Sequence, residues 1–235
     1  SHLHWYSDDG VRVNKYHISP SMWGTCNSNI GRIGVIAHEL GHFLGLPDLY
    51  DGSGGEGVGS YDLMGNSWGF RGDQYYPPIL SSWSKIQLGW ASPTVLTSGG
   101  SYSLSPWATT PDVYRIDEGF PSGEYLLIEN RQRISFDVKM PQSGITIFHI
   151  DDTAPRNEEG HPDLDGWPTN GKHYRVALLQ ADGNYDLEKG NGRGDGGDVW
   201  HSGASIGPST TNTAGPYPNT DAYQNGNIVT TGIRI

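Results

Sequence analysis

The chain is poor in cysteine, in basic residues and in long apolar runs. Cys26 is its only cysteine, so no internal disulfide can form and Cys26 is expected to be a small, partly buried thiol. Its 15 Lys and Arg stand against 26 Asp and Glu. This deficit of positive charge disfavours nucleic acid and anionic membranes as partners, because both require a basic patch. No run of about 18 apolar residues is present, which argues against a membrane-spanning helix.

Turn-forming and aromatic residues are abundant instead. The 235 residues include 34 Gly, 15 Pro, 8 Trp and 13 Tyr, and only 17% are charged. So many glycines raise the backbone entropy that a helix must overcome, and few long helices are expected. Enrichment in Trp, Tyr, Gly and Asn with little Lys favours a secreted, extracellular protein. No signal peptide opens the sequence, as is typical of a mature or trimmed product.

Two segments in the first part of the chain have helical periodicity. The first begins at Ile33, and its apolar residues predict a buried stripe. The stripe consists of Ile33, Ile36, Ala37, Leu40 and Leu44. Asn27, Ser28 or Asn29 is expected to cap this helix, and Gly45 is expected to end it. A second helix is predicted around residues 79–88, with Pro77 and Pro78 in its first turn.

After about residue 92 the pattern changes to short apolar or alternating runs between turn residues, which predicts antiparallel β-structure. The predicted strands cover residues 101–104, 113–116, 125–129, 145–150 and 175–180. The sequence as a whole therefore predicts an α+β fold with a boundary near Ala91.

The first predicted helix carries metal-binding chemistry. His38 and His42 are four residues apart, so they project from one face about one turn apart and both imidazoles can bind one metal ion. Glu39 lies about 100° further round the helix, where its carboxylate can reach a metal-bound water as a general base. Gly45 lets the chain leave the helix sharply, so that Asp48 can return as a third ligand. The pattern predicts a zinc site.

This segment, HELGHFLGLPD at residues 38–48, resembles the zinc helix of the metzincin peptidases, and more specifically that of the immune inhibitor A-like bacterial metalloproteases. Residues 61–65, YDLMG, are similar to the methionine turn of that family, and further likeness runs through residues 83–90, 125–132, 144–151, 179–183 and 194–198. The resemblance implies a metzincin-type catalytic portion over residues 1–91 and a β-rich portion of the same peptidase unit over residues 92–235.

The resemblance implies a secreted zinc endopeptidase that acts on extracellular proteins or peptides. Zn²⁺ held by His38, His42 and Asp48 would leave a position for a water whose pKa falls to roughly 7, and Glu39 would take its proton. Met64 is expected beneath the zinc as an apolar floor. In the family several strands and a helix precede the segment that opens this chain, so an upstream segment of the same precursor is an expected partner.

Three alternatives stay open at this point. Several metzincins place a tyrosine two residues after the methionine, where this chain has Asn66, and Tyr61, Tyr75 or Tyr76 could substitute for it. Glu56 is an alternative third ligand, as in peptidases with a distant glutamate. The rival function is a zinc-containing binding or structural module without activity, because a peptide substrate needs a strand to align against.

A glycine-rich stretch near the end of the chain carries candidate calcium ligands. These are Asp186, Glu188, Asn191, Asp195 and Asp198. Ca²⁺ takes about six to eight oxygen ligands, which flexible acidic loops can supply. The alternative is a solvated acidic loop, since EF-hand spacing is lacking. The remaining histidines, among them His2 and His4, have no comparable ligand spacing and are expected to be ordinary polar residues.

Overall fold

The computed structural model of the chain describes residues 5–13, 16–24, 29–158, 160–161, 163–208 and 219–235. The predictions for His2, His4, Cys26, Asn27 and Ser28 lie outside the described residues. Two short strands lead into helix α1, a 3-10 turn η1 (Gly59–Tyr61) and helix α2, and most of the β-structure follows. Within the described residues, no helix has the length and apolar character needed to cross a membrane.

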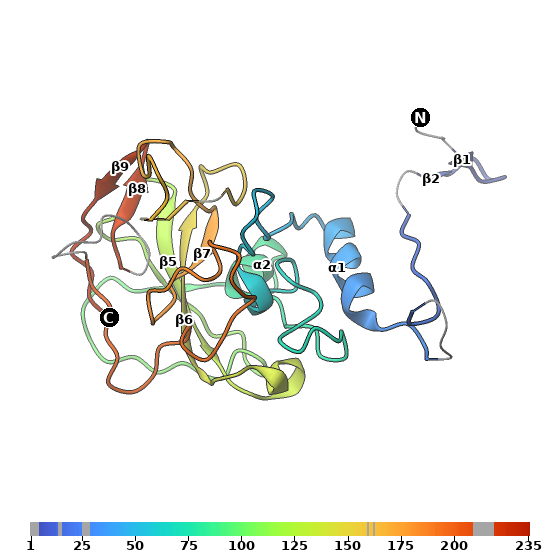
Figure 1. Ribbon diagram of the computed structural model, residues 1–235, viewed down its shortest axis with the longest axis horizontal. Helices are drawn as coiled ribbons and strands as arrows, with labels where there is room; N and C mark the ends of the chain where they lie inside the picture. The colour runs from blue at the N-terminus through green and yellow to red at the C-terminus, as the bar shows by residue number, and fades with distance from the viewer. Residues whose placement is uncertain (1–4, 14–15, 25–28, 159, 162, 209–218) are drawn as a thin grey trace.

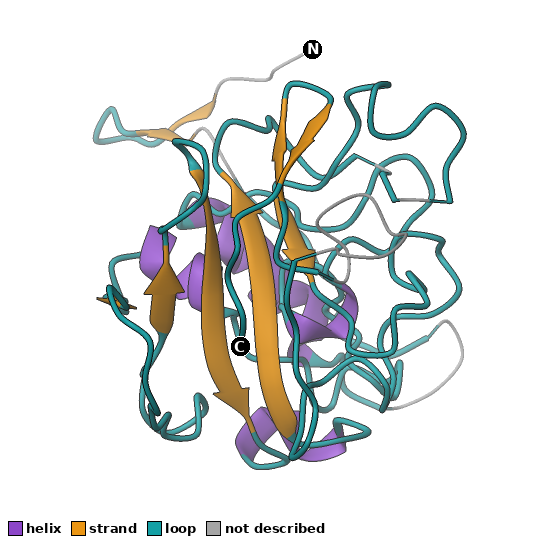
Figure 2. Cartoon of the chain, turned by 90° about the vertical axis from the view of Figure 1, so that its left-hand side faces the viewer, coloured by secondary structure: helices purple, strands orange, loops and turns teal. Residues whose placement is uncertain are grey.

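A five-stranded mixed sheet forms the centre of the fold, in the order β3-β4-β5-β6-β7. Its strands are β3 (Thr94–Val95), β4 (Tyr114–Ile116), β5 (Glu124–Arg131), β6 (Gly144–Asp151) and β7 (Val176–Leu178). The long strands β5 and β6 pair along their whole length and lie side by side in Figure 2. The predicted antiparallel pairing is correct from β4 to β7, whereas β3 pairs with β4 in parallel.

Two antiparallel pairs lie outside this sheet: β1 (Trp5–Tyr6) with β2 (Arg12–Val13), and β8 (Ala222–Gln224) with β9 (Asn227–Val229). The hairpin of β8 and β9 was not predicted. The predicted strand at residues 101–104 is wrong, because this segment has no strand pairing. The Tyr102 hydroxyl instead donates to the Ser98 carbonyl at 2.6 Å, which closes a local loop.

Helix α1 (Ile33–Phe43) turns glycines toward the body of the protein, so the predicted buried stripe is wrong. Its buried residues are Gly34 and Gly41, whereas Ile33, Leu40 and Leu44 are 50%, 55% and 57% exposed. A Cβ on Gly34 would lie 2.3 Å from the Ser67 carbonyl oxygen, and one on Gly41 2.4 Å from Met64 Sδ. The helix can therefore lie this close to the loops that carry Ser67 and Met64 only on its glycine face, and its large apolar residues point away from them.

The start of α1 also differs from the prediction. The N-cap is Arg32, whose side chain makes no capping hydrogen bond, so Asn29 is not the cap. A side chain from a distant loop takes part of that role, since Gln74 Oε1 accepts the Val35 N–H at 3.1 Å. Gly45 follows the helix with a φ of 98°, which confirms the predicted end.

Helix α2 (Ser82–Gln87) begins later than predicted, because Ser81 is its N-cap and accepts from the Ser84 N–H. The buried Asp62 reinforces this start: its Oδ2 accepts the Ser81 N–H at 2.8 Å and the Ser84 hydroxyl at 2.7 Å. Pro77 and Pro78 consequently precede the helix instead of forming its first turn. The segment 61–65 is thereby fixed to α2.

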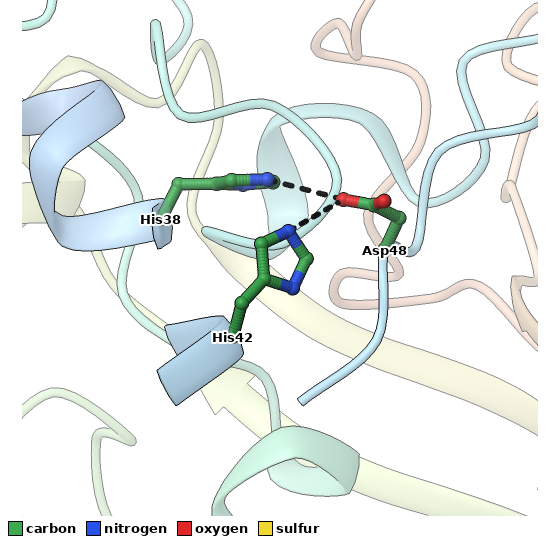
Figure 3. Close-up of side chains that lie close together, drawn as sticks. All are labelled: His38, His42 and Asp48. Carbon is green, nitrogen blue, oxygen red and sulfur yellow. Dashed lines mark hydrogen bonds and ion pairs between the residues drawn. The ribbon is translucent and has the colours of Figure 1, made fainter. Parts of the chain in front are cut away.

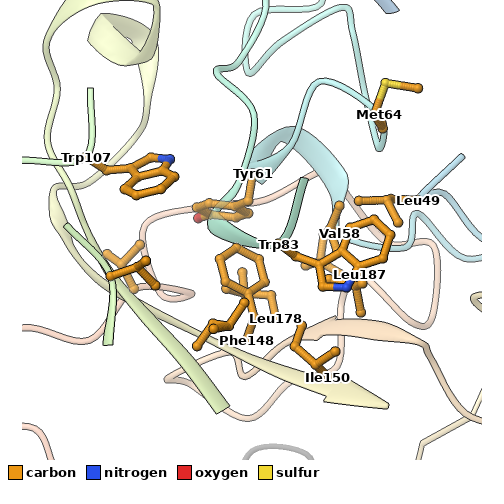
Figure 4. Close-up of a cluster of buried hydrophobic side chains, with 14 of the residues drawn as sticks. Leu49, Val58, Tyr61, Met64, Trp83, Trp107, Phe148, Ile150, Leu178 and Leu187 are labelled. Atoms are coloured by element: carbon orange, nitrogen blue, oxygen red, sulfur yellow. The ribbon is translucent and has the colours of Figure 1, made fainter. Parts of the chain in front are cut away.

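One hydrophobic cluster contains residues from both sides of residue 91 (Figure 4). From the first part it includes Leu49, Val58, Tyr61, Met64 and Trp83, and from the second part Trp107, Phe148, Ile150, Leu178 and Leu187. Burial of each large apolar side chain stabilises the fold by roughly 1.5–3 kcal/mol. The loops that follow α1 are thus packed onto the sheet, and the division at residue 91 stays a prediction.

Arg131 at the end of β5 joins the two parts by a buried polar network. Its guanidinium contacts Glu129 Oε1 at 3.0 Å and Asp137 Oδ2 at 2.8 Å, with all three side chains fully buried. It also donates to the Tyr61 carbonyl at 3.1 Å. Glu129 in turn accepts the Ser82 N–H at 2.6 Å. The network therefore links the sheet both to the start of α2 and to the segment 61–65.

Candidate metal centre

Three predicted ligands converge at the end of α1 (Figure 3). His38 Nε2 and His42 Nε2 each lie 3.1 Å from Asp48 Oδ1. The two imidazole rings meet edge to face with centroids 4.8 Å apart. The side chain of His38 is 12% exposed, and those of His42 and Asp48 are 33% and 38% exposed. The three side chains are therefore packed against the protein at His38 and open to solvent at His42 and Asp48.

Backbone carbonyls fix the orientation of both imidazole rings. His38 Nδ1 lies 3.0 Å from the Leu63 carbonyl oxygen, and His42 Nδ1 lies 2.9 Å from that of Leu46. A carbonyl only accepts, so each Nδ1 donates, and this leaves each Nε2 to face Asp48, as a metal-binding imidazole requires. A cation shared by these three atoms satisfies the arrangement, and two imidazoles with one carboxylate suit a divalent metal such as zinc.

The chain between His42 and Asp48 is held on both sides of the carboxylate. The Leu46 N–H donates to the Gly41 carbonyl at 3.0 Å, and the Leu49 N–H donates to the Met64 carbonyl at 2.9 Å. Leu46 and Leu49 are 3% and 1% exposed. Because two buried leucines flank this stretch, the backbone at Asp48 is positioned by packing as well as by hydrogen bonds.

Met64 lies beneath the helix at the point between the two histidines. Its side chain is fully buried, and its sulfur occupies the space that a side chain on Gly41 would need. The Met64 N–H donates to Asp62 Oδ1 at 2.6 Å. The same turn supplies the Leu63 carbonyl to His38. The turn thus supports the helix by an apolar contact and orients one ligand by a polar contact.

Comparison with known families adds an independent observation. Residues 3–91 match the family model described as immune inhibitor A peptidase M6, catalytic domain. This part of the chain is similar to the catalytic domain of that family. The match spans α1, the turn at Met64 and α2, and it supports a metallopeptidase. Comparisons with curated proteins and with solved structures gave no match.

Glu39 lies next to the first histidine and outside the group of His38, His42 and Asp48. Its side chain is 37% exposed, and its Oε2 lies 3.9 Å from His17 Nδ1. A carboxylate in this position on the helix is accessible to solvent and keeps its lone pairs available. It can therefore act on a water molecule without serving as a ligand.

Tyr50 also belongs to this site, although it was not predicted from the sequence. Its ring stacks on that of His38 with an interplanar angle of 16° and a centroid distance of 6.5 Å. Its hydroxyl hydrogen-bonds Asp48, which raises the pKa of Tyr50, and burial together with the charges of Asp48 and Glu39 raises it further. The signal in the sequence is its place two residues after Asp48 in the loop.

The tyrosines considered from the sequence make other contacts. The buried Tyr61 hydroxyl donates to the Asp195 carbonyl and to Asp198 Oδ2, at 3.0 and 3.2 Å. Tyr75 packs under the Arg32 guanidinium, and Tyr76 lies near the ammonium of Lys139. Asn66 donates to Ser60 Oγ at 2.8 Å within its own turn. Glu56, the alternative third ligand, pairs with Arg193 Nε at 3.1 Å.

The predicted calcium residues separate into different groups. Asp195 and Asp198 come together with Asp182, which was not predicted, so that one oxygen of each lies within 4.8 Å of the others. Burial raises the pKa of Asp198 to about 7, and the charges of Asp195 and Asp182 contribute.

The other three predicted calcium residues lie outside this acidic group. Asn191 Nδ2 donates to Asp186 Oδ1 at 3.2 Å. Glu188 is 1% exposed and accepts from Gln180 Nε2 at 2.6 Å. Calcium binding stays a prediction.

Proposed function

We propose that the chain is the catalytic part of a secreted zinc endopeptidase of the metzincin type, acting on extracellular proteins or peptides. The observation that carries the proposal is the convergence of His38 Nε2, His42 Nε2 and Asp48 Oδ1, with both Nδ1 atoms committed to backbone carbonyls. Such a donor set is typical of catalytic zinc. Secretion is supported by the composition of the chain, and the M6 family supports peptidase chemistry.

In this proposal each residue of the site has one role. His38, His42 and Asp48 hold the ion. When bound, Zn²⁺ supplies Lewis acidity toward a peptide carbonyl and makes water a stronger nucleophile. Glu39 takes a proton from the attacking water and returns it to the leaving amine. Met64 keeps the floor of the site apolar and packed against the helix.

Replacement of Glu39 by Gln tests this function. Because Glu39 is outside the ligand group, Glu39→Gln should keep about one zinc per chain while casein hydrolysis falls by 10²-fold or more, on the order of the effect of a general base. Glu118→Gln, at an exposed glutamate, removes the same charge and should retain parental activity. Casein cleavage by Glu39→Gln at the parental rate would refute the assigned base.

The rival function, a zinc-containing module without activity, makes a different prediction. The parental chain should be assayed alone and together with an upstream segment of the kind that the family resemblance implies. Hydrolysis in either assay that depends on Glu39 supports the peptidase. Full zinc occupancy with no hydrolysis in either assay would support the module instead.

A further inference from the structure

A cavity of about 320 Å³ is lined on one side by the stretch that joins His42 to Asp48. Residues 44–47 form one wall, and Trp83, Arg175 and the end of α2 form the rest. Pro47 is adjacent to Asp48 in the chain, so their Cα atoms are about 3.8 Å apart. The cavity therefore borders the metal centre through a shared piece of backbone.

Two nitrogen atoms of the cavity residues are buried donors without a partner. Trp83 Nε1 and Arg175 Nε have no hydrogen-bond acceptor among the described residues. Trp83 is 2% exposed, and the Arg175 guanidinium lies 5.6 Å over its ring. Buried donors are nearly always satisfied in proteins, so two of them on residues that line one cavity are consistent with a ligand that accepts hydrogen bonds.

Among the described residues, several arginines pair with a carboxylate, and none of these pairs involves Arg175. Arg71, Arg115, Arg131, Arg156 and Arg193 each pair with a carboxylate. In a chain of net charge −11, carboxylates are plentiful, yet none of those in the described residues lines this cavity. The half-buried guanidinium is therefore the charge that an incoming anion would meet.

The shape and chemistry of the cavity favour a carboxylate on a short aliphatic chain. A guanidinium presents a planar fork of donors that matches a carboxylate, and the indole N–H adds a further donor. Leu44, Leu46 and Pro47 provide an apolar wall for methylene groups. Both parts of an acidic side chain are thus accommodated.

We propose that this cavity binds a carboxylate of the substrate through Arg175 and Trp83, so that the enzyme prefers peptides with an acidic group near the scissile bond. The inference rests on the peptidase function proposed above, because the cavity shares its wall with the metal centre. The carboxylate can belong to a Glu or Asp side chain or to the C-terminus of a peptide.

Binding of small probes tests the cavity separately from catalysis. In calorimetric titration, N-acetylglutamate amide should bind the parental chain about 10- to 100-fold more tightly than N-acetylglutamine amide, as a charge-assisted hydrogen bond predicts. Arg175→Gln should abolish this difference. Arg133→Gln, at an exposed arginine outside the cavity, changes the net charge equally and should preserve it. Equal binding of both probes to the parental chain would overturn the proposal.

Two further variants keep the test decisive if Arg175→Gln fails to fold. Arg175→Lys keeps the charge but loses the planar fork, so it should reduce the preference for the acidic probe without abolishing it. Trp83→Phe removes the indole N–H and should weaken binding of the acidic probe alone. Parental preference in both variants would overturn the assignment of these donors.

Cleavage of matched peptides then identifies the source of the carboxylate. Four peptides are compared: each has Glu or Gln beside the scissile bond and ends in either an amide or a free carboxylate. The kcat/KM should differ about 10- to 100-fold either between Glu and Gln or between the free and the amidated C-terminus, depending on which carboxylate binds. Arg175→Gln should bring that ratio close to one. Equal cleavage of all four peptides would refute the inference while leaving the peptidase intact. Binding of the acidic probe without hydrolysis of any peptide would refute the peptidase instead and support the carboxylate site.

Discussion

Replacement of Arg131 by Met should destabilise the protein strongly, because it leaves two buried carboxylates without their cation. Arg131, Glu129 and Asp137 are fully buried at their side chains, and the guanidinium contacts the two carboxylates at 3.0 and 2.8 Å. Removing one member of a buried ion network typically costs about 3–5 kcal/mol. A typical domain has only about 5–15 kcal/mol of stability, so the loss should be a large fraction of the total.

Urea unfolding at pH 7.5, followed by tryptophan fluorescence, measures this loss. Burial already raises the pKa of Glu129 and of Asp137 although Arg131 opposes it, so protonation at pH 4.5 should reduce the deficit of Arg131→Met. Arg156→Met is the matched control, since Arg156 is 73% exposed and pairs with Glu158 at the surface. Its loss should stay below about 1 kcal/mol. A loss below that value in Arg131→Met would refute the reasoning.

Other variants test the remaining contacts. Burial raises the pKa of Glu188 to about 8 from 4.5, so the folded protein binds a proton that the unfolded chain releases, and its stability falls as the pH rises from 4.5 to 8. Glu188→Gln removes this loss and should be more stable than the parent at pH 8.5, by on the order of 2–5 kcal/mol. Below pH 4.5 the variant should have no such advantage. Urea unfolding measures both differences, and an equal difference at both pH values would contradict this expectation. Asp48→Ala should lower zinc affinity measured by chelator competition, while Glu56→Ala keeps it; the reverse result would favour Glu56 as the ligand. Met64→Ala should lower the free energy of unfolding by about 2–5 kcal/mol and Met64→Leu by less than about 1.5; similar losses would show that the apolar volume under the helix is unimportant.

The local geometry of the candidate metal centre could be predicted from the sequence. Four-residue spacing on a helix places His38 and His42 together, and a glycine that adopts positive φ lets Asp48 return to them. These features depend on a few consecutive residues and on backbone geometry. The role of Glu39 as a general base stays a prediction.

Features that depend on packing between distant segments could not be predicted in this way. The prediction of the buried face of α1 was wrong because Gly34 and Gly41 let the helix backbone approach the rest of the protein more closely than large apolar side chains would. This close approach depends on Ser67 and Met64, which lie far from the helix in the sequence. Hydropathy favours burial of Ile33 and Leu40, but the short distance between the helix and its neighbours leaves room only for glycine on the buried face. Asp182 joins Asp195 and Asp198 from a separate segment of the chain, so the spacing of these residues in the sequence does not reveal the group.

The glycine face of α1 has a mechanical consequence for the metal centre. A side chain between two elements acts as a soft spacer, since rotamer changes let the elements shift relative to each other. At Gly41 the backbone of α1 rests on the Met64 sulfur without such a spacer, and the Leu63 carbonyl of the same turn holds His38. Helix and turn should therefore move as one rigid body, so that thermal motion of the scaffold displaces the floor and the ligand of the site together.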